Sequence, residues 1–268
     1  MFEKYYFLFG LALVWIVFAV VQDLRTREVS NWLNFSLIAF ALSYRAFWSI
    51  WNNDLMFFVY GALGILIFVG LAYLFYYGRA FAGGDAKLLM GLGGVLPFES
   101  LKGIVIFGGG FVFLLFGIGA VYSLVYTFFL VFGNWEKFVV EFKREYAEKK
   151  LLFVIALFSV LILQVIVRFY SYDVLGLLSL LILIFPLLLI YTKAVEKGCL
   201  IKMVGFDRLR EGDWLEENVK VGGKIIKKNV HGLSLKEIRF LKKNKKNVLI
   251  KEGIPFTPAF FFAFILGV

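Results

Sequence analysis

The chain is poor in the residues that build most metal and thiol sites. Cys199 is the single cysteine among 268 residues, and His231 is the single histidine. One cysteine excludes an intramolecular disulfide and any zinc site built on paired cysteines. One Cys and one His also give no basis for a histidine-rich metal site or a Cys–His nucleophile pair. Any chemistry is therefore expected from other side chains.

Two further patterns are missing. The start, Met1-Phe2-Glu3-Lys4, has neither the basic region nor the small-residue cleavage site of a secretory signal, so we expect the first apolar run to be a retained helix. Alternating strands are also absent, which argues against a transmembrane barrel. Apolar residues, in contrast, make up 61% of the chain, where soluble domains are nearer half. These features predict an all-α polytopic membrane protein.

The apolar segments predict eight helices. Segment 86–97 is short for a span, which needs about 20 residues, and segment 103–133 is long enough to tilt. If two of these helices merge, or if 134–168 is interfacial, the number of spans falls, so we expect six to eight transmembrane helices. The predicted helices lie near 5–22, 32–51, 55–77, 86–97, 103–133, 151–168, 174–192 and 255–268.

The positive charge is concentrated in one segment. Sixteen Lys/Arg and seven Asp/Glu lie between residues 193 and 251, which accounts for nine of the ten net positive charges. Such a patch is typical of nucleic-acid binding. In a chain this apolar, we interpret it instead as a cytoplasmic segment attracted to anionic membrane lipids, with no nucleic-acid partner. The turns around Arg25 and Lys87 are expected on the same cytoplasmic face.

The charge and hydropathy patterns also predict the domain organisation. Residues 1–193 form a transmembrane core, in which 134–150 is either an amphipathic surface helix or a polar loop. Residues 194–253 form a small basic cytoplasmic α+β insert, and 254–268 form a C-terminal membrane segment. Within the insert, Ser234 and Glu237 fit a capping box that opens a short helix. An insert of about sixty residues is marginal as an independent fold.

Two aspartates are placed unusually. Asp23 follows the apolar run 5–22, and Asp85 follows Phe81-Ala82-Gly83-Gly84. An ionised carboxylate at a membrane boundary is costly unless it is paired or hydrated, so both residues are functional candidates. The simple alternative is an ion pair with a nearby cation such as Arg25, Arg27 or Lys87. From the residues alone, an ion pair and a carboxylate dyad both remain open.

A dyad of Asp23 and Asp85 hydrolyses a peptide bond without a metal or another cofactor. The two groups share one proton, because like charges a few ångström apart do not both ionise. One carboxylate takes a proton from water, and the protonated partner polarises the carbonyl. Gly83 and Gly84, which have no side chains, leave space for an extended substrate backbone beside Asp85.

Two other classes of protein use such acids differently. In an ion- or proton-coupled transporter, Asp23 and Asp85 bind a cation or relay protons. Such a transporter is expected to carry inverted repeats, and the sequence shows no internal repeat. A membrane scaffold that docks through its basic segment gives no reason for a paired aspartate motif.

The two motifs resemble those of a known family. The run from Asp23 to Asn31, with basic residues after the aspartate and a Val-Ser-Asn ending, is similar to the first motif of the type IV prepilin peptidases. Ala82-Gly83-Gly84-Asp85 is similar to their GxGD motif, with Ala82 at the first glycine position. The archaeal preflagellin (prearchaellin) peptidases are the nearest subgroup, and the segment 251–259 resembles their C-terminal region. The resemblance implies catalytic roles for Asp23 and Asp85.

The resemblance also implies a substrate and a location. The family removes short basic leaders, called class III signal peptides, from preflagellin or type IV pilin-like precursors at the cytoplasmic face of the cell membrane. We therefore expect a multi-pass membrane aspartic endopeptidase with precursor proteins and lipids as partners. Bacterial relatives also methylate their products through a region that contains a CxxC motif. Nothing before Asp23 matches that region, so we expect protease activity alone.

Overall fold

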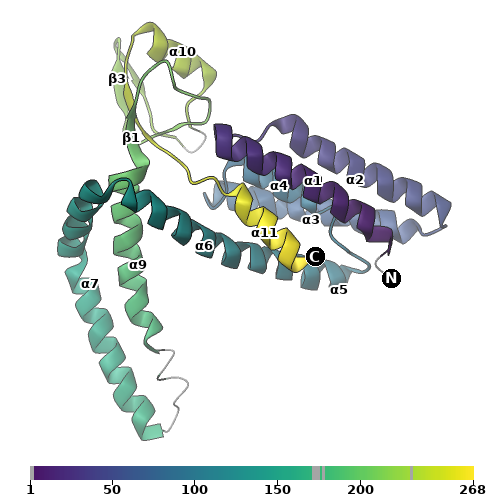
Figure 1. Cartoon of the computed structure of the whole chain (residues 1–268), viewed down its shortest axis with the longest axis horizontal. Helices are drawn as coiled ribbons and strands as arrows, with labels where there is room; N and C mark the ends of the chain where they lie inside the picture. The colour runs from purple at the N-terminus through teal and green to yellow at the C-terminus, as the bar shows by residue number, and fades with distance from the viewer. Residues whose placement is uncertain (1–2, 171–175, 177–178, 230–231) are drawn as a thin grey trace. The chain divides into compact units, whose positions relative to one another are not determined.

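A computed structural model describes residues 3–170, 176, 179–229 and 232–268 of the chain (Figure 1). The chain divides into two compact units. Unit 1 contains residues 1–125 and 254–268, and unit 2 contains residues 126–253. The last fifteen residues therefore return to the unit that the first part of the chain forms. Helices 151–168 and 174–192 were expected in the transmembrane core, but they lie in the same unit as the 194–253 segment.

The described residues of unit 1 form helices joined by turns, with no strand among them. The short helix α4 packs against α2 and α3, and the C-terminal helix α11 packs against α1 (Figure 1). A three-residue helix, α5, leads through the π-helical turn η1 into α6, which continues past the boundary of the unit. The elements are α1 (Glu3–Thr26), α2 (Asn31–Trp51), α3 (Leu55–Tyr77), α4 (Gly83–Leu92), α5 (Leu101–Gly103), η1 (Ile104–Gly108), α6 (Gly109–Phe132) and α11 (Thr257–Gly267).

Helices α1 and α2 each bury one face, and each of these buried faces includes polar residues. In α1 the buried positions recur every three or four residues, as expected for one face of a helix, and the stripe ends on Asp23: Tyr5, Leu8, Ala12, Ile16, Ala19 and Asp23. In α2 the buried set is Leu33, Asn34, Leu37, Ala41, Arg45 and Ser49. The outward faces are apolar, so hydropathy alone does not separate the two sides of these helices.

Arg45 ties α2 to the segment that follows α4. Its side chain is fully buried, and its guanidinium donates to the carbonyl oxygens of Gly94 at 2.7 Å, Phe57 at 2.8 Å and Leu96 at 2.8 Å. A Cβ on Gly61 would lie 2.2 Å from Arg45 Cδ, so a glycine is required in α3 at this level. Gly61 therefore has a packing role, and Arg45 fixes the segment that follows α4.

Five helices among the described residues are long and apolar enough to cross a membrane: Glu3–Thr26, Asn31–Trp51, Leu55–Tyr77, Leu101–Phe132 and Trp135–Arg168. This agrees with the expected helical, polytopic membrane fold. Within the described ranges, α9 and α11 are shorter than a full span. A total of six to eight spans therefore depends on how these two helices sit in the bilayer. Part of the predicted helix 174–192 lies outside the described residues.

Unit 2 begins with a long helical hairpin. Helices α7 (Trp135–Tyr170) and α9 (Leu181–Val195) pack side by side (Figure 1). The expected amphipathic segment 134–150 and the expected span 151–168 form one continuous helix. Its 36 residues correspond to about 54 Å, well beyond the roughly 30 Å of a hydrocarbon core. We therefore expect the charged first half of α7 to extend outside the apolar layer of a membrane.

The basic insert is a small α+β region with its own core. A π-helical turn, η2 (Glu196–Leu200), leads into an antiparallel sheet of order β1-β5-β2, and β3 pairs with β4. Val204 lies opposite Val248, and Val219 lies opposite Ile226. The capping box predicted at Ser234 is present, because the Glu237 carboxylate accepts from Ser234 N at 2.8 Å. The elements are β1 (Ile201–Val204), β2 (Trp214–Leu215), β3 (Val219–Val221), β4 (Lys224–Ile226), α10 (Leu235–Lys243) and β5 (Val248–Lys251).

Candidate active site

Asp23 lies in the last turns of α1, on the buried stripe of that helix. Only 7% of its surface is exposed. Its Oδ2 atom accepts two hydrogen bonds from Thr257, the first residue of α11: one from the backbone N at 3.1 Å and one from the hydroxyl at 2.9 Å. The carboxylate is therefore held by a residue 234 positions away in the sequence, and the packing of α1 on α11 carries this contact.

Asp85 lies in the first turn of α4 and is equally buried, with 7% of its surface exposed. Its Oδ2 accepts a hydrogen bond of 3.3 Å from the backbone N of Ala82, the N-cap residue. Ala82 has no side-chain oxygen to return, so this is half of a capping box. A carboxylate in the first turn also interacts favourably with the positive end of the helix dipole. Helix α4 was predicted at 86–97; it begins three residues earlier, at Gly83, and ends at Leu92, so Asp85 is its third residue.

The two carboxylates interact with each other. Burial raises the pKa of the Asp85 carboxyl above its usual range, and the charge of the nearby Asp23 carboxylate raises it further. The hydrogen bond from Ala82 acts in the opposite direction and is outweighed. The structure thus brings together two acids that are 62 positions apart in the sequence, and it favours a proton on Asp85.

The ion-pair alternative finds little support at Asp85. Lys87 is two residues away, but its Nζ donates to Asn31 Oδ1 at 2.5 Å. Among the described residues, no cation forms an ion pair with Asp85, and none contributes to its pKa. Asp85 therefore lacks the neutralising partner that a structural buried carboxylate usually has.

Gly83 and Gly84 occupy the first two positions of α4, directly before Asp85. A Cβ on Gly84 would lie 3.2 Å from Val29 Cβ, so this glycine allows the turn after α1 to pack closely against α4. A Cβ on Gly83 would meet nothing closer than Tyr76 Cε2 at 3.8 Å. Gly83 therefore has room for a methyl group, whereas Gly84 has a packing role.

Three polar residues of unit 1 were not singled out from the sequence. Thr257 holds Asp23, as described above. Gln22 braces the turn after Asp23, because its Oε1 accepts from Ser30 N at 3.0 Å and from Ser30 Oγ at 2.9 Å. Asn34 is 1% exposed, and neither amide atom has a hydrogen-bond partner among the described residues. Each is a polar side chain in or beside an apolar run, and this pattern could have identified it in the sequence.

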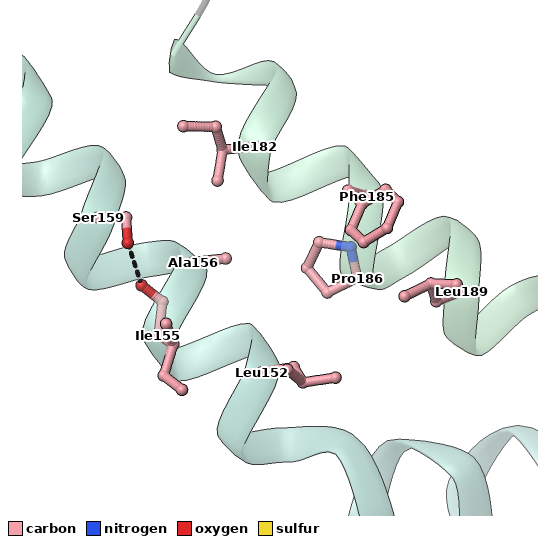
Figure 2. Close-up of a pocket in the computed structure, with 8 residues that line it drawn as sticks. All are labelled: Leu152, Ile155, Ala156, Ser159, Ile182, Phe185, Pro186 and Leu189. Atoms are coloured by element: carbon pink, nitrogen blue, oxygen red, sulfur yellow. Dashed lines mark hydrogen bonds between the residues drawn. The ribbon is translucent and has the colours of Figure 1, made fainter.

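Neither a metal cluster nor a cavity in unit 2 offers another site among the described residues. In the described part of the chain, no group of three or more His, Cys, Asp or Glu side chains is arranged to hold a metal ion. A cavity of about 370 Å³ lies between α7 and α9 in unit 2, and Figure 2 shows the residues that line it. Its walls are almost entirely apolar. Ser159, the one hydroxyl there, donates to the backbone oxygen of Ile155 at 2.9 Å.

Comparison with known proteins finds the same family that the two aspartate motifs resemble. Residues 10–140 match the sequence profile of the type IV leader peptidase family. The chain is also similar to a preflagellin peptidase of Methanocaldococcus jannaschii, with 29% identity over 82 residues. That alignment covers 31% of this chain and 35% of the relative, so the chain spans about a third of the length of the relative that it matches. No solved structure matches the chain.

The matched region includes both aspartates and the glycines of α4. It also includes α2 to α4 and most of α1, which carry the two acids and their near neighbours in the sequence. Thr257 and the rest of α11 lie outside it. The match to the type IV leader peptidase family therefore covers the part of the chain that contains the two acids.

Proposed function

We propose that the chain is a membrane aspartic endopeptidase of the GxGD type that removes the short basic leader from preflagellin or type IV pilin-like precursors. The observation that carries the proposal is the pair Asp23 and Asp85. These two buried, interacting carboxylates lie in a region that matches a leader peptidase family. The similarity to a preflagellin peptidase supports this class of substrate.

The chemistry follows from two acids that share one proton. The ionised carboxylate takes a proton from a water molecule as the water oxygen attacks the carbonyl carbon of the scissile bond. The protonated carboxyl donates to the carbonyl oxygen, which stabilises the tetrahedral intermediate. When the C–N bond breaks, the first carboxyl passes its proton to the leaving nitrogen. Water is consumed, and the pair returns to its starting protonation.

The position of the acids suits a substrate whose apolar helix stays in the membrane. Asp23 ends a helix that is long enough to cross the bilayer, and Asp85 begins a short helix that is not. Cations in the adjoining turns, Arg25 and Arg79 among them, favour the cytoplasmic side. A leader cleaved there leaves the membrane helix on the mature protein. Gly83, which has no side chain and is not crowded by its neighbours, is proposed to lie beside the extended peptide.

The test is cleavage of a preflagellin-like precursor by membranes that carry the wild type, Asp23→Ala or Asp85→Ala. The wild type should convert the precursor to a shorter product, whose new N-terminus marks the end of the leader. Both variants should leave the precursor intact. Asp54→Ala is a matched control, because Asp54 caps α3 by accepting from Phe57 N at 3.2 Å and is not one of the two acids. Cleavage by either site variant at the wild-type rate would rule out the dyad.

A further inference from the structure

Thr257 and Asp23 form a buried contact in which two donors of one residue bind the same carboxylate oxygen. Thr257 is fully buried, and it is the first residue of the eleven-residue helix α11. Its backbone N–H and its hydroxyl converge on the same oxygen, Asp23 Oδ2. The next residue, Pro258, has no N–H, so Thr257 supplies both donors at this helix end. The positive end of the helix dipole adds to their attraction for a carboxylate.

Because both donors bind Oδ2, Oδ1 is the oxygen of Asp23 that remains available for a water molecule. The backbone N–H can only donate, and with the hydroxyl donating to the same atom, Oδ2 is a less favourable place for a proton than Oδ1. Oδ1 has no hydrogen-bond partner among the described residues, so it is free to accept from a water molecule. The orientation of the carboxylate plane is thereby fixed, which is the main requirement for proton transfer to a positioned base.

We propose that Thr257 is the positioning residue of Asp23: it fixes Oδ2, directs Oδ1 toward the attacking water and makes Asp23 the member of the pair that takes the proton from that water. This inference rests on the proposed function and assigns different roles to the two acids. In this scheme Asp23 accepts the first proton and Asp85 donates one. The water proton moves to Asp23 Oδ1, the water oxygen bonds to the carbonyl carbon, and the Asp85 proton moves to the carbonyl oxygen.

The second half of the reaction restores both acids. As the C–N bond breaks, the proton on Asp23 moves to the leaving nitrogen, and the proton of the hydroxyl that formed from the carbonyl returns to Asp85. The surroundings of Asp85 agree with its role as the acid. Its hydrogen bond from Ala82 is single and long at 3.3 Å, and its pKa is raised by burial and by Asp23. Asp23 has two donors and Asp85 has one, which is the asymmetry that separate roles require.

A purely structural role is the competing explanation, in which Thr257 only anchors α11 to α1. The two explanations differ in what the hydroxyl does. Thr257→Val removes the hydroxyl but retains the shape and the backbone N–H, and Thr257→Ser restores the hydroxyl on a smaller side chain. Thr192→Val is the matched control, because the Thr192 hydroxyl bonds the Leu188 carbonyl oxygen at 2.8 Å within α9.

Kinetics with a leader-bearing precursor provide the first readout. Thr257→Val should lower kcat about ten- to a hundred-fold, the range for losing one hydrogen bond to a charged group, while KM stays within about threefold. Thr257→Ser should recover kcat to within about threefold of the wild type. Thr192→Val should behave as the wild type. An undiminished kcat in the valine variant, or a serine variant as slow as the valine variant, would overturn the positioning role.

Infrared spectroscopy provides a readout that does not depend on cleavage. In protein labelled with ¹³C-aspartate, the Asp23 carboxylate band is identified by its loss in Asp23→Asn. Thr257→Val should shift this band, and Thr192→Val should leave it in place. A shifted band in a protein that cleaves no leader-bearing precursor would refute the proposed function and keep the contact. Unchanged cleavage together with an unshifted band would refute the inference and keep the function.

Discussion

Glu145 in unit 2 and Asp85 in unit 1 are carboxylates of similar burial with very different neighbours. Glu145 is fully buried in α7, and it accepts from Lys197 Nζ at 2.5 Å and also from Lys149 Nζ. Asp85 has one backbone donor and the Asp23 carboxylate beside it. The cations hold Glu145 in its charged form, whereas the surroundings of Asp85 favour a bound proton. A neutralised buried acid such as Glu145 is expected to serve the fold, whereas a buried acid without a cation, such as Asp85, is a candidate for chemistry.

The largest effect on this comparison between the two acids is expected when Asp23 or Asp85 is replaced by an amide of the same shape. Asp23→Asn and Asp85→Asn should each lower precursor cleavage at least about a hundred-fold, because proton transfer by a positioned side chain contributes that much or more. Thermal unfolding of Asp85→Asn should occur at or above the wild-type temperature, since the variant removes a buried acid without a cation. A substantial cleavage rate in either variant would contradict the proton roles.

Glu145→Gln should give the opposite pattern. Removing the charge leaves Lys149 and Lys197 unpaired, and both lysines are partly hydrated, so we expect a loss of about 1–2 kcal/mol in the free energy of unfolding. Cleavage per folded molecule should be unchanged. Glu148→Gln is the control, because Glu148 pairs with Arg144 at the surface, where such pairs contribute about 0.5 kcal/mol or less. Equal losses in the two variants would show that burial of Glu145 has no special effect.

The two glycines of α4 sharpen the comparison within the site. Gly83→Ala has room for its methyl group and should unfold at the wild-type temperature, while KM for the precursor rises several-fold if the peptide passes there. Gly84→Ala forces a shift against Val29 and should cost about 1 kcal/mol of stability. Calorimetry and steady-state kinetics separate the two effects. An unchanged KM in both Gly83→Ala and Gly83→Leu would remove Gly83 from the substrate path.

The smallest expected effect concerns Asn34. Its amide is buried without a partner among the described residues, which is unfavourable by about 1–3 kcal/mol. Asn34→Leu should therefore raise the unfolding free energy by about 1 kcal/mol, once imperfect packing of leucine is allowed for. Asn31→Leu should lower it, because Asn31 accepts the hydrogen bond of Lys87. A loss of stability in Asn34→Leu would indicate that the amide makes a favourable interaction in the folded protein.

Much of the fold could be predicted from the sequence, because long apolar runs leave few alternatives in a membrane. Helices α1, α2 and α3 begin and end within about four residues of their predicted limits. The shortness of α4 and the capping box at Ser234 were also predicted correctly. The division at residue 150 was wrong. A change from charged to apolar residues looks like an element boundary, but charged residues with good helix propensity continue the same helix in α7.

The two candidate acids could be identified from the sequence, but their contacts could not. Asp23 and Asp85 stand out because carboxylates are rare beside apolar runs, and their flanking residues carry the family resemblance. The bond to Thr257 joins positions 234 residues apart, and no local pattern specifies it. The contacts of Arg45 could not be predicted either. Its acceptors are three backbone carbonyl oxygens, which the sequence does not distinguish from any others.

The most direct test of the central claim is an infrared titration of the Asp85 carboxyl. Asp85 should stay protonated well above the usual pH range of an aspartic acid, so the wild type should show a carboxylic acid band that Asp85→Asn lacks. Because the Asp23 charge raises this pKa, Asp23→Asn should move loss of the band to lower pH, while burial still holds it above the ordinary value. A band lost at the ordinary pH of an aspartic acid, or a titration that Asp23→Asn leaves unchanged, would contradict the account of a proton-sharing pair.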